Sequence, residues 1–504
     1  MTITYESRPS VRGQLAANVI GRAWVLLSNL VFFPVYLDLL GMRSFGVIAL
    51  FIAIVALITF LDMGLSPTLA RELNDQSHSS LEKIDLLFTY EVAYAALVSA
   101  IVLLALLLPL EAFKLVVSPA DLARPEIAQS IRLVFVAAAT QMLLNFYIAG
   151  LLGIEQQVKG NVVLLSAGIV RSALVIVPLW FFPTPKVFLV WQLITLLVFT
   201  IVARSILYGL VKVNEIGRSP SFEHAALFRN YSFMGSVFLV SITAAINTQI
   251  DKIFIGRIVG LEALASYSLV STFALVLVFA VTPITITLLP RFVRMVSSGD
   301  NESARDLLIL THRVIAAIVC TGVGSMIWFG PYLISLWTAG RLSAESVSTY
   351  LPALVIGYGL LALSMVPHCI AIAHKNMRGS VFTAFSVFLT VPSFWIFIGR
   401  FELEGAAATW LALQLVVVPL YLVWIDRTLT HVGGLLRLLV TTVLFPLAVT
   451  VTVCFAAYQL FGEGSEVWHN LIVITFAVLA SLVCCLMITL RPSDRMYLLQ
   501  FRAR

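Results

Sequence analysis

Long apolar segments recur along the whole chain, and they constrain the fold more than any other feature. A helix needs about 20 mostly apolar residues to cross the hydrocarbon core of a bilayer. Fourteen segments meet that length: 14–40, 45–66, 85–108, 131–154, 161–182, 187–211, 229–256, 262–290, 308–334, 350–373, 379–399, 404–425, 436–461 and 468–490. Only Arg400 to Glu404 separates 379–399 from 404–425, which leaves open whether these two are one helix or two. The sequence therefore predicts an all-α, polytopic membrane protein of about fourteen transmembrane helices.

The composition excludes a soluble protein. Hydrophobic residues make up 60% of the 504 residues and charged residues 12%, whereas an ordinary soluble domain has about 25% charged residues. A soluble chain of this length could not bury so much apolar surface. All five cysteines lie inside apolar segments without metal-ligand spacing. We therefore expect them to pack as small apolar side chains, with no disulfide and no metal site.

Several chemistries lack the residues that they need. The longest loop, 109–130, is too short to fold as a separate domain. No Gly-Lys dipeptide occurs, which excludes a Walker A loop and with it ATP drive within this chain. The chain also lacks a His-Glu dipeptide, a G-x-S-x-G elbow and a D-x-D pair, the marks of zinc hydrolases, serine hydrolases and metal-dependent glycosyltransferases. We expect a protein that is not an enzyme and that uses no cofactor.

The basic residues are distributed unevenly between the two sides of the predicted helices. With the N-terminus placed in the cytoplasm, 18 of the 32 Lys and Arg residues fall on the cytoplasmic side and 7 on the outer side. This bias follows the positive-inside rule, so the net charge of +6 needs no nucleic-acid partner to explain it. The first apolar segment is too long for a signal peptide. An even number of helices then places both termini in the cytoplasm.

A weak internal repeat relates the two halves of the chain at an offset of 219–220 residues. The turn around Gly41 corresponds to the turn around Gly260, and Arg71 corresponds to Arg291. The repeat unit is six helices, and an even shift keeps the same membrane orientation. Transporters with such parallel repeats hold the substrate between the halves near the middle of the membrane. The predicted domains are two six-helix lobes and a pair of extra helices with a basic cytoplasmic tail: 1–211, 212–435 and 436–504.

Polar side chains follow one face of two repeat-related helices. Asn18, Arg22 and Asn29 share a face of the first segment. Asn247 and Asp251 share a face of the seventh. A charged group at this depth costs on the order of 2.5–3.5 kcal/mol on insertion scales, so it normally faces a water-filled cavity or a partner. We expect both stripes to line one central cavity, with hydrogen bonding between packed helices as the alternative.

Further polar residues lie in neighbouring segments. Arg171 is the deepest isolated cation, near the middle of the fifth segment. If Arg171 does not face a cavity, the alternative is that it forms an ion pair with Asp62 or Glu91. Asn145 is expected at the cavity wall. Lys252 lies at the outer end of the seventh segment and points about 100° away from the residue before it.

Several short motifs resemble those of a known family of membrane proteins. In the first half they are Pro34-Val35-Tyr36-Leu37-Asp38-Leu39-Leu40-Gly41, Phe45-Gly46, Leu61-Asp62-Met63-Gly64-Leu65 and Arg71-Glu72-Leu73. In the second half they are Gln249-Ile250-Asp251-Lys252-Ile253-Phe254-Ile255-Gly256, Tyr267-Ser268 and Leu289-Pro290-Arg291. With these residues the chain resembles the Wzx-type polysaccharide and O-antigen flippases of the multidrug/oligosaccharidyl-lipid/polysaccharide exporter superfamily.

The resemblance implies both a fold and a cargo. It implies two six-helix lobes in a V around a central cavity, and two last helices similar to those that form a groove for the lipid tail in lipid II flippases. The implied cargo is an undecaprenyl-diphosphate-linked oligosaccharide, which moves from the inner to the outer leaflet of the bacterial inner membrane. The implied partners include the polysaccharide polymerase and the chain-length machinery.

An anionic diphosphate needs cations and polar donors along its path. We interpret six residues as substrate-binding: Asn18, Arg22, Asn29, Asn145, Arg171 and Lys252. Three residues are interpreted as an ion-coupling group for a proton or Na⁺: Asp62, Asn247 and Asp251.

The sequence thus predicts a flippase for surface polysaccharide biosynthesis that works by alternating access. A cation-coupled multidrug antiporter is one alternative, and it would favour acidic, aromatic cavities. A membrane-bound polysaccharide polymerase or transferase is another, although it would need longer outer loops and paired carboxylates. A pore without coupling is the third.

Overall fold

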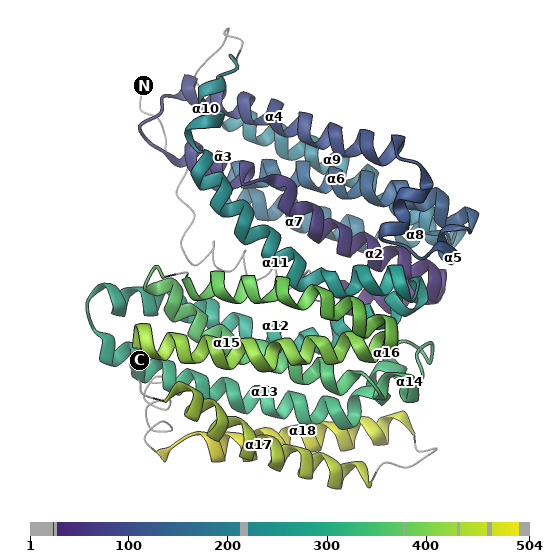
Figure 1. Ribbon diagram of the computed structural model, residues 1–504, viewed down its shortest axis with the longest axis vertical. Helices are drawn as coiled ribbons and strands as arrows, with labels where there is room; N and C mark the ends of the chain where they lie inside the picture. Colours follow the sequence, from purple (N-terminus) through teal and green to yellow (C-terminus); the bar gives the residue numbers. More distant parts are fainter. Residues whose placement is uncertain are drawn as a thin grey trace. The chain divides into compact units, whose positions relative to one another are not determined.

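The structure, a computed structural model, describes Trp24 and residues 28–211, 220–376, 378–430, 434–460 and 466–492. Within these residues the regular structure is entirely helical (Figure 1). The backbone separates into two compact units, Met1–Ser268 and Leu269–Arg504, called unit 1 and unit 2 below. The predicted lobes 1–211 and 212–435 rest on the internal repeat rather than on compactness, and they stay a prediction.

Unit 1 begins with the apolar helix Ser28–Leu40. The elements that follow it are α2 (Met42–Ile58), η1 (Thr59–Asp62), α3 (Leu65–Asn74), α4 (Ser80–Leu107), η2 (Leu110–Leu115), α5 (Pro119–Leu122), α6 (Pro125–Gly153), α7 (Gln157–Ser172), α8 (Ile176–Phe181), α9 (Pro185–Val211), α10 (His224–Arg229), α11 (Tyr231–Ile258) and the start of α12 (Leu261–Ser297).

Unit 2 contains the rest of α12 and the elements that follow it. They are α13 (Asn301–Trp337), α14 (Ala344–Ser348), α15 (Leu351–Ala373), α16 (Arg378–Ile425), the π-helix η3 (Asp426–Thr430), α17 (Leu435–Tyr458) and α18 (Val467–Thr489).

Twelve helices in the described residues are long and apolar enough to cross a membrane. The shorter helix Ser28–Leu40 belongs to the first predicted segment, whose beginning lies outside the described residues. The span Thr390–Leu429 has 40 residues, about twice the length that one crossing needs. Together these spans account for the fourteen predicted segments.

The long helix α16 consists of two helices that fold back on each other. At Glu402 the backbone leaves the helical region, with φ 48° and ψ −123°. A Cβ on Gly405 would overlap the carbonyl oxygen of Phe397, although residues eight apart in a straight helix lie about 12 Å apart along the axis. The chain therefore reverses here. This finding settles the break between 379–399 and 404–425 in favour of two helices.

One central helix organises each unit. In unit 1, α6 contacts α2, α3, α4, α7 and α9; in unit 2, α13 contacts α15, α17 and α18. Both helices are mostly buried, whereas only 22–28% of the apolar windows of α4, α17 and α18 is buried. Phe476 on α18 is 76% exposed. Exposing these apolar helix surfaces to water would cost free energy, whereas in a bilayer they face lipid.

Glycines permit close approach between particular helices of unit 1. A Cβ on Gly46 of α2 would overlap the carbonyl oxygen of Leu261, and one on Gly64 would lie 2.9 Å from the backbone of Met234 on α11. Gly64 also has φ +77°, a conformation that other residues rarely adopt. Both glycines belong to the motifs quoted above. These motifs therefore include residues that let α11 and the start of α12 pack against α2 and the segment that follows it.

The packing of α6 on α3 gives a direct test of the fold. In Gly153→Ala the new methyl group would lie 2.5 Å from the carbonyl oxygen of Ala70 and 2.6 Å from its Cα. Because these are backbone atoms, the helices must separate, and we expect a loss of about 1–3 kcal/mol of stability. The measurement is the thermal unfolding midpoint of the purified protein in detergent.

The matched control is Gly209→Ala on α9, where a Cβ would meet nothing within 4 Å. Alanine is the better helix former, so this variant is expected to melt no earlier than the wild type. Equal melting of Gly153→Ala and the wild type would contradict the close contact between α6 and α3.

Candidate functional site

Arg171 on α7 binds a pair of amide side chains on α6. Its guanidinium donates to Oε1 of Gln141, and Nε2 of Gln141 donates to Oδ1 of Asn145 over 3.0 Å. The backbone carbonyl of Arg171 accepts from Nε2 of Gln192 on α9 over 3.3 Å. The structure thus brings two predicted site residues, Arg171 and Asn145, into one hydrogen-bonded cluster inside the membrane-spanning part of unit 1.

Within the described residues, no carboxylate forms an ion pair with Arg171. The two carboxylates proposed as its alternative partners are bound elsewhere. Glu91 pairs with Arg204, and Asp62 accepts hydrogen bonds from Ser66. A guanidinium has five N–H donors, and the side-chain partner of Arg171 is a neutral amide. This arrangement leaves a positive charge at membrane depth with no described counter-charge, which is the electrostatic condition for binding an anion.

The pairing of Glu91 was not predicted from the sequence. Nε of Arg204 on α9 lies 2.6 Å from Oε1 of Glu91 on α4, and Tyr147 on α6 donates to the same oxygen over 2.9 Å. The hydroxyl of Tyr208 donates to the other carboxylate oxygen, and the guanidinium of Arg204 lies over the ring of Tyr208. Three helices are joined by this cluster. The sequence pointed to this ion pair only in that it places one acid, Glu91, and one base, Arg204, in two predicted membrane spans.

The first helix lies beside the Arg171 cluster. The hydroxyl of Tyr36 donates to the carbonyl oxygen of Ser172 over 2.5 Å. A Cβ on Gly168, one turn before Arg171, would lie 2.9 Å from Nε1 of Trp24. Asn29 is half-buried on the same helix as Tyr36. The other two members of its predicted stripe, Asn18 and Arg22, lie outside the described residues, and their placement stays a prediction.

A second polar group lies on α11. Asp251 is 6% exposed, and its Oδ2 accepts from the hydroxyl of Tyr267 over 2.9 Å. Its Oδ1 accepts the backbone N–H of Lys252 over 2.8 Å. One turn away, Oδ1 of Asn247 is buried and accepts no hydrogen bond within the described residues. A buried carboxylate and an unsatisfied amide oxygen on one helix face form a set of oxygen atoms that suits a proton or a hard cation.

The side chain of Lys252 binds groups of its own helix, α11. Its Nζ donates to the carbonyl oxygen of Thr248 over 3.4 Å and to Oε1 of Gln249 over 3.3 Å. Within the described part of unit 1 these contacts do not reach the Arg171 cluster, so the structure does not bring these two predicted substrate-binding cations together.

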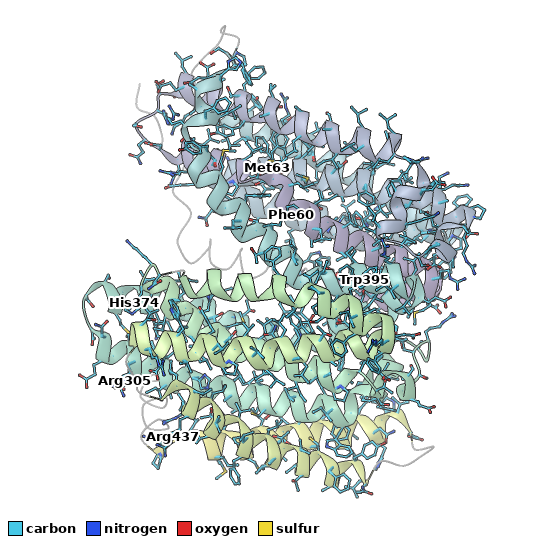
Figure 2. All side chains as sticks on the ribbon, in the orientation of Figure 1. Phe60, Met63, Arg305, His374, Trp395 and Arg437 are labelled. Atoms are coloured by element: carbon cyan, nitrogen blue, oxygen red, sulfur yellow. The ribbon has the colours of Figure 1, made fainter. Side chains whose placement is uncertain are left out.

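Asp62 lies at the opposite end of α11 from Asp251. Its carboxylate accepts the N–H of Ser66 over 3.2 and 3.3 Å and the hydroxyl of Ser66 over 2.6 Å, which caps the start of α3. The neighbouring ring of Phe60 packs against Phe238 of α11. Phe238 precedes Asp251 by thirteen residues, or about 20 Å of helix. Figure 2 labels Phe60 and Met63 where α2 gives way to α3. The structure therefore separates Asp62 from the other two residues assigned to ion coupling.

The two repeat-related turns meet at Asp121. Its Oδ2 accepts the N–H of Leu261 over 2.8 Å and the hydroxyl of Ser118 over 2.9 Å. Arg43 lies 3.4 Å from its Oδ1 and 3.0 Å from Glu262. The turn after the first helix and the turn after α11 are thus joined through one carboxylate on the loop 109–130.

Glu72, in the middle of the Arg71-Glu72-Leu73 motif, holds the segment that precedes α11. It is buried and binds Arg229 over 2.9 Å, Asn230 over 2.8 Å and His78 over 3.1 Å. Tyr90 donates to the carbonyl oxygen of Ala226 nearby. This motif therefore fixes α10 and the beginning of α11 against α3 and α4.

Comparison with known families identifies the chain. A family described as "Polysaccharide biosynthesis protein" matches residues 16–296, more than half of the chain. The chain belongs to this family. The matched residues include the motifs quoted above, the Arg171 cluster and the Asp251 group. No curated protein sequence shows a significant match.

Solved structures share the fold across nearly the whole chain. The lipid II flippase MurJ in an inward closed conformation has a TM-score of 0.71 at 15% identity, covering 93% of this chain and 97% of that one. An inward-facing multidrug resistance MATE family transporter of the MOP superfamily has a TM-score of 0.64 at 14% identity, covering 83% and 99%. The MATE multidrug transporter DinF-BH, solved in a complex, has a TM-score of 0.60 at 12% identity, covering 84% and 96%.

At these identities the structural similarity shows the fold alone. It confirms the predicted polytopic helical fold. Family and fold together point to a transporter rather than an enzyme.

Proposed function

We propose that this member of the polysaccharide biosynthesis family flips undecaprenyl-diphosphate-linked oligosaccharides across the bacterial inner membrane. Transport proceeds by alternating access between lobes bounded at 1–211 and 212–435, with 436–504 as accessory helices. The family match and the fold shared with the lipid II flippase MurJ support this proposal. Association with polysaccharide polymerase and chain-length machinery stays a prediction.

Arg171 is the observation that carries the proposal. A guanidinium inside a membrane span, hydrogen-bonded to a neutral amide and without a described counter-charge, favours an anionic ligand. The neighbouring Asn145 and Gln141 offer the amide donors and acceptors that suit sugar hydroxyls. A diphosphate with an attached oligosaccharide presents both kinds of group.

The sidedness of unit 2 supports the proposed orientation. Figure 2 shows Arg305, His374 and Arg437 at one end of the unit 2 helices and Trp395 at the opposite end. The first three lie at or beside the basic loops that the positive-inside rule assigns to the cytoplasm. With both termini on that side, the basic end of unit 2 faces the cytoplasm, where the lipid-linked substrate is made.

The substitution Arg171→Gln tests the cargo class. Because a hydrogen bond from a charged group contributes about 1.5–3 kcal/mol, we expect the flipping rate to fall by roughly 10- to 100-fold. The assay uses proteoliposomes with a labelled prenyl-diphosphate oligosaccharide and follows the appearance of sugar in the opposite leaflet.

Arg132→Gln on α6 is the matched control. Its guanidinium donates to the backbone carbonyl of Leu108, away from the predicted site residues. This variant is expected to flip within about twofold of the wild type, because the contact that it removes lies outside the proposed substrate path. Normal flipping by a folded Arg171→Gln protein would overturn the role of Arg171.

We infer in addition that transport is coupled to a proton or Na⁺ at Asp251 and Asn247. The buried carboxylate and the unsatisfied amide oxygen support this inference. Coupling requires that the ion bind the two conformations with different affinities. Asp62, which caps α3, is bound by Ser66 and lies apart from this pair.

Asp251→Asn tests the coupling. An imposed ion gradient is expected to accelerate flipping by the wild type and to have no effect on Asp251→Asn, because the amide keeps the shape but loses the charge that binds the ion. Asp62→Asn is the matched carboxylate control and is expected to stay gradient-sensitive. A gradient response retained in Asp251→Asn and lost in Asp62→Asn would reverse the assignment.

A cation-coupled multidrug antiporter is the second candidate. The fold shared with MATE transporters and the buried Asp251 favour it. Gradient-driven efflux of a cationic dye, without flipping of any prenyl-diphosphate glycan, would establish this function instead.

A further inference from the structure

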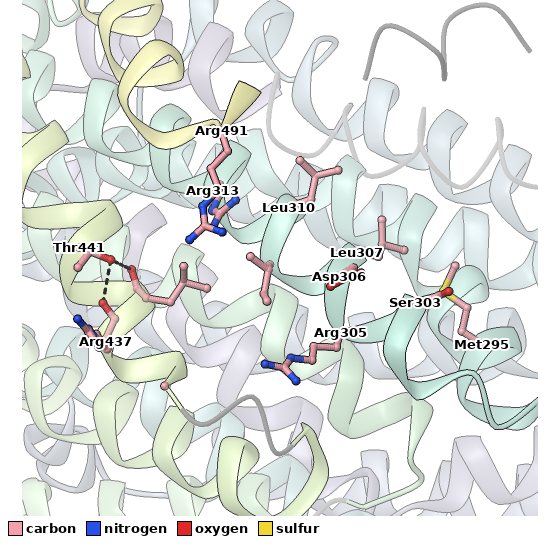
Figure 3. Close-up of a pocket in the computed structure, with 13 residues that line it drawn as sticks. Met295, Ser303, Arg305, Asp306, Leu307, Leu310, Arg313, Arg437, Thr441 and Arg491 are labelled. Carbon is pink, nitrogen blue, oxygen red and sulfur yellow. Dashed lines mark hydrogen bonds between the residues drawn. The ribbon is translucent and has the colours of Figure 1, made fainter. Parts of the chain in front are cut away.

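Four arginines line one cavity of unit 2, away from the residues discussed above. The cavity has a volume of about 1090 Å³ and lies among the N-terminal parts of α13 and α17, with Arg491 just after α18. Arg305 and Arg313 come from α13 and Arg437 from α17 (Figure 3). These residues are brought together from segments up to 186 positions apart in the chain.

The lining carries an excess of positive charge. Among the described residues that line the cavity, Asp306 is the one acid beside the four arginines. A second carboxylate, Asp426, accepts the N–H groups of the lining residue Gly434 and of Leu435 over 2.7 and 3.1 Å, at the start of α17. Several guanidinium groups around one concave space form a geometry that suits phosphate oxygens.

The cavity lies at the beginning of α17 and just past the end of α18, where membrane-spanning helices meet the headgroup region. Arg437 is the third residue of α17, and Arg491 follows the last residue of α18 by two positions. Helix α13 has 37 residues and is therefore about 56 Å long, which exceeds the hydrocarbon core of about 30 Å. A helix of this length extends past the core, and Arg305 lies in its first turns. Arg313 lies about 18 Å along the helix axis from Asn301, the first residue of α13. It is 7% exposed.

Apolar side chains lie beside the arginines. Leu307, Leu310 and Leu438 line the same cavity. On α17 the face that carries Arg437 and Thr441 continues to Leu444, which is 64% exposed. A soluble anion would make no use of this apolar path. A lipid would bind its phosphate among the guanidinium groups and lay an acyl chain along α17.

We propose that this cavity binds the phosphate-bearing headgroup of an anionic membrane phospholipid on the cytoplasmic side. Basic pockets between transmembrane helices on this side are suited to such headgroups. The bound lipid tethers α17 and α18 to α13, which α17 and α18 both contact. The site is independent of the proposed transport function, because none of its residues belongs to the Arg171 cluster or the Asp251 group.

The test uses the full chain in detergent with added cardiolipin, whose two phosphates serve as the probe. Binding is followed by native mass spectrometry and by the shift in the thermal unfolding midpoint. We expect the double variant Arg437→Gln/Arg491→Gln to bind cardiolipin at least tenfold more weakly than the wild type, and its cardiolipin-induced stabilisation to disappear. The matched control is Arg124→Gln/Arg400→Gln, which removes two exposed arginines at other sites and is expected to bind as the wild type does.

Three outcomes would overturn the proposal. One is unchanged cardiolipin binding by the Arg437/Arg491 variant. Another is an equal loss in the control, which would show a general charge effect. The third is inorganic pyrophosphate stabilising the wild type with the same dependence on the two arginines, which would show a site for soluble anions. If the glutamine variant fails to fold, Arg437→Lys/Arg491→Lys keeps the charges but loses the planar fork, and it is expected to bind with intermediate affinity.

Discussion

The free-energy cost of placing a charge in hydrocarbon determines how the charged side chains inside unit 1 are partnered. A charged side chain in a membrane span persists when it meets a partner, a helix terminus or a polar path. Arg204 meets Glu91, supported by two tyrosines. Arg171 meets amide groups and no described carboxylate. This difference between two cations in neighbouring helices separates a structural ion pair from a residue suited to bind an anion.

The family motifs have distinct physical roles in unit 1. Gly46 and Gly64 remove side chains where the start of α12 and α11 approach α2 and the segment after it. Glu72 holds the segment before α11, and Asp121, which lies outside the quoted motifs, joins the two repeat-related turns. These contacts all connect the first predicted lobe to the beginning of the second. If transport proceeds by the proposed alternating access, these contacts between the predicted lobes must rearrange, so a family motif can serve transport without touching the substrate.

Hydropathy and charge bias were sufficient to predict the helical membrane fold. Each crossing needs its own apolar segment, so the number of segments limits the number of helices. The sequence places a break at Arg400 to Glu404 but leaves open whether the chain reverses there, because a reversal within a few residues depends on backbone geometry such as the close approach of Gly405 to Phe397.

The partners of individual charges were harder to predict. Helical spacing places Asn247 and Asp251 on one face, but it does not show that Asp62 turns back to cap α3 or that Glu91 meets Arg204. The arginine cavity of unit 2 could not be predicted from the sequence, because Arg305, Arg437 and Arg491 come together only when α17 and α18 pack on α13.

Ligand charge selectivity distinguishes a site for an anionic prenyl diphosphate from a site for cationic drugs. The measurement is equilibrium binding of a fluorescent prenyl diphosphate to the wild type in detergent, with a prenyl monophosphate and a cationic dye as competitors. We expect the diphosphate to bind roughly tenfold more tightly than the monophosphate, as one additional charge-assisted contact would give, and the dye not to displace it. Tight binding of the dye with no binding of the prenyl diphosphate would show that the protein does not carry an anionic lipid-linked cargo.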